Sequence, residues 1–221
     1  DLGKLKEAEL STRKAVELNP DFAEAHLNLG TILKDLGKLK EAFDSYLKVI
    51  EINPTYPNIY SYITQFLLDS DPSQLNKSKL KDILNLLLEK NNVPHKKIIR
   101  AFNFLYSDEI ISSLEKFAYD FSEIELLINN KIIINTLKKV TFKDIRIEEV
   151  LTKARRNLCD RVAKKIETIN YSELQFIITL GEQCFLNEYV YSLTAAEKVS
   201  LKVIIEGCKD NELSESNLSI L

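Results

Sequence analysis

Apolar residues recur every three or four positions along most of this chain, which is the spacing of one face of an α-helix. The clearest such face comprises Ile147, Val150, Leu151, Ala154, Leu158, Val162 and Ile166. No glycine occurs between Gly37 and Gly181, so the tight turns that a β-sheet needs have few candidates. We therefore predict helices over residues 4–18, 23–36, 39–52, 57–69, 77–90, 95–105, 108–120, 123–139, 144–168, 173–192 and 195–210.

Several of these helices have a recognisable start. Ser122–Glu125, Ser172–Gln175 and Thr194–Glu197 each place a hydroxyl three residues before a carboxylate or amide. This capping box lets both side chains bond the exposed backbone donors of a first turn. Ser107 is followed by two acidic residues, which the helix dipole favours at a helix start. The pattern predicts that helices begin at these four places.

The first part of the chain repeats itself. The octamer Asp1–Ala8 recurs letter for letter at Asp35–Ala42, which is 34 residues later. The register continues, because Leu18-Asn19-Pro20 is answered by Ile52-Asn53-Pro54. A fixed period of this length indicates one structural unit that is used more than once.

This period resembles the tetratricopeptide repeat, whose units are pairs of antiparallel helices. The resemblance assigns Gly30 to the first helix of a unit, Gly37 to the turn and Ala42 to the point where the two helices touch. Pro54 closes the unit. We therefore expect an all-α fold, a tetratricopeptide helix-turn-helix solenoid followed by a non-repeating helical region.

The repeats are expected to stop near the turn cluster Asp69–Ser73. Residues 57–69 fit the first helix of a further unit, but Tyr60 and Thr64 stand at its key positions and no matching second helix follows. We expect a truncated array at 1–70, a non-repeating helical region at 71–212 and a tail or linker at 213–221. Residues 1–22 supply only the turn and second helix of a unit, so we expect a longer protein.

Composition and charge limit the classes of function that this chain can have. Hydrophobic residues make up 45% and charged residues 29% of the chain, and no stretch approaches the roughly 18–20 apolar residues of a membrane span. The net charge of −3 predicts no nucleic-acid partner. Charge is uneven, with ten basic against four acidic residues in Lys138–Lys165 and seven acidic against three basic in Glu182–Leu221. These stretches are either solvated faces that pair with each other or a basic surface for an acidic or phosphate-bearing partner.

The sequence offers no recognisable catalytic centre. No Gly-x-Gly or phosphate-binding loop is present, so we expect no cofactor. His26 fits a core position of the repeat and His95 is expected to face solvent, which leaves no serine-histidine arrangement. Cys159, Cys184 and Cys208 have no metal-type spacing. We expect buried thiols, no metal, no enzymatic activity in this chain and a cytoplasmic location.

A binding surface remains as the functional candidate. The resemblance implies that first helices line a concave peptide-binding groove, here with Glu24, Leu27, Asn28, Thr31, Lys34 and Asp35. Asn28 stands where repeats of the protein O-linked N-acetylglucosamine transferase family carry asparagines that hold a peptide backbone. An amide suits that role because it donates and accepts. The next unit has Tyr62 there, so an asparagine row ends after one residue. The competing interpretation is an ordinary exposed asparagine.

A second resemblance lies near the C-terminal end. Glu182–Tyr191, followed by Thr194–Glu197, is similar to a helical segment in bacterial proteins that join tetratricopeptide repeats to an S-adenosylmethionine-dependent methyltransferase domain. The resemblance covers the chain from about Phe142 onward and implies that a methyltransferase domain lies outside this chain. From the residues alone, core packing of this segment is the simpler interpretation. The alternative is that Gln183, Asn187 and Glu188 form a polar contact with the following domain.

That interpretation makes a packing prediction. On a helix from near Ser172, Phe176, Leu180 and Cys184 should form one buried stripe that extends toward Asn187, with Ile177, Phe185 and Tyr189 beside it. One side should meet the 144–168 helix, and the other should meet the helix after Thr194 through Val199, Val203 and Ile204. If Phe185 is exposed instead, it belongs to a docking face for an absent domain.

The function that follows is a protein- or peptide-binding scaffold plus a connecting region that precedes a methyltransferase domain. Two alternatives stay open: the scaffold of a repeat-containing glycosyltransferase, or an adaptor with no enzymatic domain. A strand followed by Gly-x-Gly after residue 221 would favour the methyltransferase.

Overall fold

The computed structural model describes residues 2–116, 125–142, 144–164, 171–186 and 193–210, and this part of the chain is helical and contains no β-strand. The helices are α1 (Leu2–Leu18), α2 (Ala23–Asp35), α3 (Leu39–Ile52), α4 (Ile59–Asp69), η1 (Pro72–Gln74), α5 (Lys77–Glu89), η2 (His95–Lys97), α6 (Ile99–Lys116), α7 (Glu125–Ile128), α8 (Lys131–Lys139), α9 (Ile145–Lys164), α10 (Tyr171–Leu186) and α11 (Ala195–Asp210). They form two compact units, residues 1–106 and 107–221. None of the described helices is long and apolar enough to cross a membrane.

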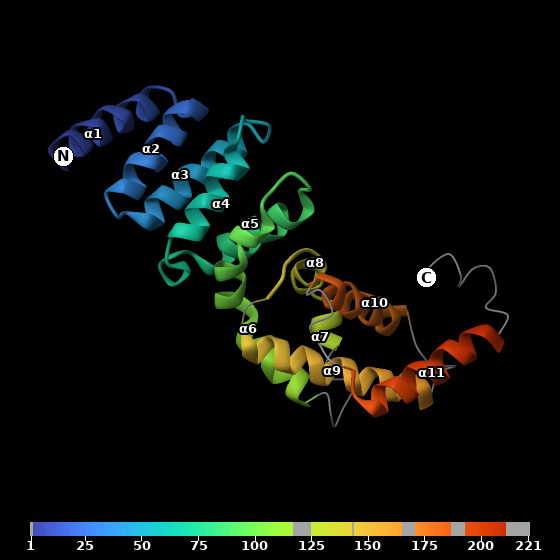
Figure 1. Ribbon diagram of the computed structural model, residues 1–221. Coiled ribbons are helices and arrows are strands. Elements are labelled where there is room, and N and C mark those ends of the chain that lie inside the picture. Colours follow the sequence, from blue (N-terminus) through green and yellow to red (C-terminus); the bar gives the residue numbers. More distant parts are fainter. Residues whose placement is uncertain (1, 117–124, 143, 165–170, 187–192, 211–221) are drawn as a thin grey trace. The chain divides into compact units, whose positions relative to one another are not determined.

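The repeat builds the start of the first unit. α2 packs against α1 on one side and α3 on the other, and α3 packs against α4, as Figure 1 shows. The predicted helices 4–18, 23–36 and 39–52 are confirmed to within two residues at each end. Ala42 is fully buried, as the register required. The repeat pattern therefore predicted both the helices and the buried side of α3.

Two glycines make the α2–α3 pair possible. A Cβ atom added to Gly30 would lie 2.8 Å from Cε1 of Tyr46, so the ring of Tyr46 occupies the space that a side chain would take. Gly37 forms the turn between the helices with a φ of +74°, a conformation that residues with a Cβ rarely adopt. The first glycine permits a close approach and the second permits the turn.

An aromatic cluster joins the third helix to the fourth. Phe43 and Tyr46 of α3 both contact Phe66 of α4, with ring centroids 5.8 and 5.5 Å apart. All three side chains are almost fully buried. Aromatic pairs at these separations add to the stability gained from burial alone. The cluster fixes α4 as the next helix of the stack.

The first unit continues past the array expected at residues 1–70. Lys79 of α5 bonds Asp44 of α3 at 2.7 Å, and η2 packs on α4. The domain boundary expected at residue 70 stays a prediction, because membership of a compact unit does not mark where a repeat array ends.

One predicted helix break is wrong. Residues 95–105 and 108–120 were expected as separate helices, with a start at Ser107. Instead α6 runs without a break from Ile99 to Lys116, and Ser107 is buried inside it. The reason is a continuous buried stripe at steps of four: Phe102, Tyr106, Ile110 and Leu114. That stripe outweighs the local preference of serine and two acids for a helix start.

One predicted helix is in fact two. Residues 123–139 were expected as a single helix, but α7 ends at Ile128 and α8 begins at Lys131. Asn130 caps α8, because its Oδ1 accepts hydrogen bonds from the backbone N–H groups of Ile132 and Ile133 at 3.1 and 3.3 Å. Asparagine is among the best helix-capping residues, so the Asn129-Asn130 pair was an overlooked signal.

The packing of the second unit differs from the sequence prediction. α9 buries the predicted stripe from Ile147 to Val162. α10 buries Phe176 and Leu180, but it packs mainly on α8, while α11 packs on α9. The predicted contact of α10 with α9 is confirmed. The predicted contact with α11 was expected through Val199, Val203 and Ile204, and it is wrong for Val199 and Val203, whose side chains are 65% and 45% exposed.

The capping boxes have different outcomes. The box at Thr194 is confirmed: the backbone N–H of Thr194 donates to Glu197 Oε2 at 2.8 Å, and that of Glu197 donates to Thr194 Oγ1 at 3.2 Å. Ser172 is not a cap, because α10 is already helical at Tyr171. Ser122 lies outside the described residues, as do Ile166 and the side chain of Phe185.

Candidate protein-binding surface

α2 presents a polar row to solvent. Glu24, Asn28, Thr31 and Asp35 are exposed, and they recur at steps of three and four because they lie on one face of the helix. The amide of Asn28 makes no hydrogen bond to another described residue. Leu27 is only 9% exposed, so it offers little surface to a ligand.

α4 presents the matching face of the next unit. Tyr62 stands 34 residues after Asn28 and is 46% exposed, and Leu68 is 40% exposed. Ser61 and Asn58 are also exposed. We call the exposed side chains of α2 and α4 together the α2–α4 face. It is polar on α2 and mixed aromatic, aliphatic and amide on α4.

A chain of hydrogen bonds crosses this face. Lys34 of α2 donates from Nζ to Asp69 Oδ2 at 2.7 Å, and Gln65 Nε2 donates to Asp69 Oδ1 at 2.8 Å. Lys97 of η2 donates from Nζ to Gln65 Oε1 at 2.8 Å. The chain therefore links α2, α4 and η2 through four side chains.

The charges of the four side chains in this hydrogen-bonded network do not cancel. The hydrogen bond from Lys34, then that from Gln65, holds the pKa of Asp69 below its ordinary range, so Asp69 is a carboxylate at neutral pH. It neutralises Lys34, whereas the hydrogen-bond partner of Lys97 is a neutral amide. One positive charge is left over at the η2 end. Gln65 and Lys97 were not among the predicted site residues.

Tyr46 is a further residue that the sequence did not single out. Its ring fills the space beside Gly30, and its hydroxyl lies 3.4 Å from Thr31 Oγ1 on the α2–α4 face. Burial raises the pKa of Tyr46 above its ordinary value, so the phenol stays protonated at neutral pH. Tyr46 is buried in the core and its hydroxyl contacts Thr31 of this face, so it links the packing of α2 against α3 to the α2–α4 face.

The histidines are structural. His26 is 9% exposed, and its Nε2 lies 2.8 Å from the backbone oxygen of Pro20, which confirms the predicted core position. His95 was expected to face solvent, but it is half-buried with Nε2 at 3.2 Å from the backbone oxygen of Leu87. The described residues contain no cluster of histidine, cysteine or carboxylate groups that could hold a metal.

The uneven charge of the second unit is partly resolved by pairing. Arg155 and Arg156 of α9 bind Glu197 at 2.9 and 3.3 Å, and Lys138 lies 3.8 Å from Glu182. These pairs join the basic stretch to the acidic one. They support the interpretation as mutually paired helix faces over that of a basic surface for a partner.

Little of the segment behind the methyltransferase resemblance is described. In Glu182–Tyr191, Gln183 is almost fully buried, while the side chains of Cys184 and Phe185 and all of residues 187–191 lie outside the described residues. The buried Gln183 belongs to the core of the second unit.

Comparison with known families gives one match. Residues 23–56 match the family model of the tetratricopeptide repeat. The match spans α2 and α3, the unit that the internal period predicted, and supports a role in binding proteins. No curated protein and no solved structure matches the chain. The link to a methyltransferase domain has no support in these comparisons.

Proposed function

We propose that the first unit binds a segment of another protein across the α2–α4 face. The observation that carries this is the tetratricopeptide match at residues 23–56 together with a row of solvent-exposed polar side chains on its first helix. Asn28 supports a peptide-binding role because its amide has no partner in the described structure and can both donate and accept. Tyr62 supports it because exposed aromatic side chains are frequent anchors of binding surfaces.

Peptide selection tests this proposal. Random peptides of about 12 residues, roughly 40 Å long when extended, are displayed on phage and selected on the purified chain. Isolated peptides are measured by fluorescence anisotropy. We expect Asn28→Ala and Tyr62→Ala each to weaken binding about tenfold, the size of a typical anchor contact. Lys40→Ala, at an exposed position of α3, serves as the control and should bind as the natural chain does. Peptides that bind Asn28→Ala and Tyr62→Ala as tightly as the natural chain would refute the proposal.

We further propose that the helical region 71–212 joins the repeats to a methyltransferase domain outside this chain. The support is the resemblance of Glu182–Tyr191 to segments that occupy this place in such proteins. A glycosyltransferase scaffold and an adaptor without an enzymatic domain are the alternatives, and the cytoplasm stays the expected compartment. The test is the full-length gene product: S-adenosylmethionine binding by it supports the proposal, and nucleotide-sugar binding supports the first alternative.

A further inference from the structure

α6 is the helix that runs from the first compact unit into the second. The first unit ends at Tyr106 and the second begins at Ser107, while α6 continues from Ile99 to Lys116 (Figure 1). A continuous helix is stiff, because each backbone N–H is bonded to the carbonyl four residues earlier. How freely the two units move against each other therefore depends on the turn of α6 around Ser107.

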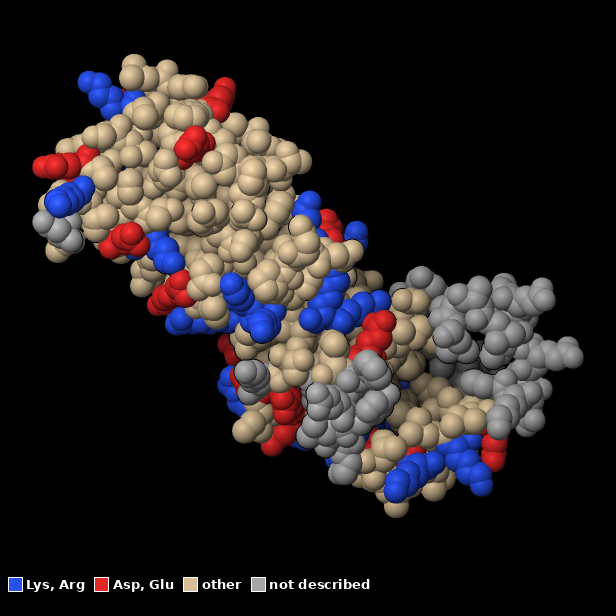
Figure 2. All heavy atoms as spheres, turned by 45° about the horizontal axis from the view of Figure 1, so that its top comes forward, with Lys and Arg blue, Asp and Glu red and all other residues tan. Residues whose placement is uncertain are grey.

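The sequence at this boundary favours a helix start. Ser107 is followed by Asp108 and Glu109, and both acids are exposed. Figure 2 shows acidic side chains at several separate places on the surface, so these two are distinguished by their position after a serine. A serine cap and acids in a first turn stabilise a helix terminus. In the middle of a continuous helix both effects are lost, because the backbone N–H groups are already bonded.

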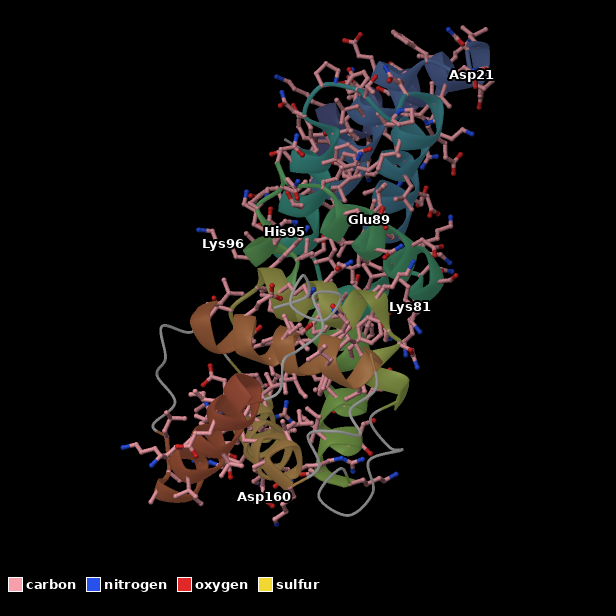
Figure 3. The ribbon with its side chains drawn as sticks, turned by 90° about the vertical axis from the view of Figure 1, so that its right-hand side faces the viewer. Asp21, Lys81, Glu89, His95, Lys96 and Asp160 are labelled. Atoms are coloured by element: carbon pink, nitrogen blue, oxygen red, sulfur yellow. The ribbon has the colours of Figure 1, made fainter. Side chains whose placement is uncertain are left out.

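The part of α6 before Ser107 is attached to α5. Lys81 of α5, which Figure 3 labels, lies over the ring of Tyr106, with Nζ 5.6 Å from the ring centroid. Lys77 of α5 lies over the ring of Phe104 in the same way, at 5.4 Å. Each cation contributes an attraction to the ring face. Because α5 belongs to the first unit, these contacts hold the first part of α6 to that unit.

The part of α6 after Ser107 interacts with the second unit. The hydrogen bond from Arg146 of α9 to Asp144 is the main cause of the raised pKa of Arg146, and the charge of Asp108 adds to it. Ile110 is almost fully buried and belongs to the second unit as well. The attachments of α6 therefore change from one unit to the other at Ser107.

One turn before Ser107, the continuous helix leaves a polar atom without a partner. Oδ1 of Asn103 is buried and accepts no hydrogen bond from the described residues. A buried acceptor without a partner costs free energy, which contact with water recovers. The cost disappears when the turn between Asn103 and Ser107 opens and water reaches the amide. This observation is independent of the serine and of the two acids.

We propose that α6 is a hinge whose turn at residues 104–107 opens, so that Ser107 becomes the cap of a separate helix beginning at Asp108 and the two units reorient. The continuous helix is the form in the structure, and the buried stripe Phe102, Tyr106, Ile110 and Leu114 stabilises it. The open form keeps the contacts of Tyr106 and of Asp108, because each lies within one unit.

Hydrogen exchange of the α6 amides in the full chain tests the opening. The first N–H groups of a new helix have no partner in a preceding turn. We expect the amides of residues 107–109 to exchange at least about tenfold faster than those of 102–105 and 112–115. Equal exchange along α6 overturns the proposal. So does exchange that slows steadily from Lys116 inward, because that pattern is fraying from the helix end.

Substitution of Ser107 tests its role as a cap. Ser107→Ala removes the cap and favours the continuous helix, so exchange at residues 107–109 should slow at least about fivefold. Ser107→Thr keeps a hydroxyl and should exchange as the natural chain does. Ser113→Ala, the same change farther along α6, is the control and should leave these amides unchanged. Unchanged or faster exchange in Ser107→Ala overturns the proposal.

A second variant guards against misfolding of Ser107→Ala, which circular dichroism detects. Glu109→Lys, at an exposed position, puts a positive charge in the first turn of the new helix, where the dipole disfavours it. Exchange at residues 107–109 should therefore slow at least about threefold. Unchanged exchange in Glu109→Lys overturns the proposal in that case.

Reorientation of the units is measured separately. Spin-labelled unnatural amino acids replace Lys40 in the first unit and Lys153 in the second, both at exposed positions, and electron resonance gives the spread of distances between them. We expect a narrower spread in Ser107→Ala than in the natural chain and in Ser113→Ala. The same spread in all three shows that α6 opens without reorienting the units, and the hinge is refuted.

Discussion

At the scale of single residues, the contact between Gly30 and Tyr46 controls the first unit. Tyr46 is 2% exposed and is packed on Phe66, so its ring has no room to move away from α2. Its hydroxyl also reaches Thr31 on the α2–α4 face. The residue therefore connects the packing of the repeat to the surface proposed for binding.

We expect Gly30→Ala to destabilise the chain by about 1–3 kcal/mol, as overpacking of a filled core does. The added Cβ would lie 2.8 and 2.9 Å from Cε1 and Cδ1 of Tyr46, which outweighs the roughly 1 kcal/mol that alanine gains over glycine in a helix. Urea unfolding gives the free energy. Relief of the penalty in Gly30→Ala combined with Tyr46→Leu would identify the ring as its cause.

Gly181→Ala is the matched control. Gly181 is also inside a helix, but no heavy atom lies within 4 Å of its added Cβ. That substitution should stabilise the chain by about 0.5–1 kcal/mol. If both substitutions raise the free energy of unfolding, the close approach at Gly30 is not a constraint.

At the scale of elements, Glu197 joins α11 to α9. It completes the capping box of α11 and binds Arg155 and Arg156 of α9 while only 3% exposed. Burial by itself would raise the pKa of Glu197. Hydrogen bonds from Thr194 and the charge of Arg155 outweigh that effect and lower the pKa below its ordinary value. The side chain of Glu197 therefore both caps its own helix and holds α11 against α9.

The direction of that shift predicts how stability depends on pH. A carboxyl with a lowered pKa in the folded state stabilises the fold fully above the ordinary glutamate value of about 4.3 and loses this contribution as the pH falls through the lowered value. We expect Glu197→Gln to cost about 1–3 kcal/mol at pH 7 and to remove part of the acid sensitivity. Hydrogen exchange of the α11 amides and unfolding at several pH values measure both effects.

Glu206→Gln is the control, because Glu206 lies on the same helix with its side chain 59% exposed and 3.9 Å from Lys202. It should change stability by no more than about 0.5 kcal/mol. A difference between the natural chain and Glu197→Gln that stays constant from pH 7 to about pH 3 would show that Glu197 is not the group that titrates.

At the scale of the whole molecule, two helical units stand in sequence, and the features that suggest binding are in the first. The α2–α4 face belongs to residues 1–106. The second unit directs several of its charges toward each other, through Glu197 and through the pair of Lys138 with Glu182. This distribution favours recognition by the first unit.

We expect the isolated chain to bind neither S-adenosylmethionine nor a nucleotide sugar. Both ligands are commonly held where a glycine-rich turn lets the backbone approach them closely, and the sequence has no Gly-x-Gly. Isothermal calorimetry at micromolar concentrations measures this, with a peptide that binds the same preparation as the positive control. Saturable heat from either cofactor would place a catalytic function in this chain.

What the sequence could predict was local or periodic. The 34-residue period located α1, α2 and α3, and the Thr194–Glu197 spacing located the start of α11. Helical spacing also located the buried stripe of α9. These signals succeed because a backbone donor and its cap, or two positions four apart on one helix face, lie within a single turn.

The tertiary structure decided what depends on residues far apart. Ser107 and Asn130 are both good helix-capping residues, yet only Asn130 begins a helix, because the apolar stripe of α6 continues through Ser107. Likewise, Gln65 joins Lys97 across 32 positions and Glu197 joins Arg155 across 42. Such pairs form only when packing brings distant helices together. Burial then determines how much each pair contributes to stability. The sequence by itself therefore determined the repeat and most of the helices. Tertiary packing determined which helices contact each other and which side chains form the surface proposed for binding.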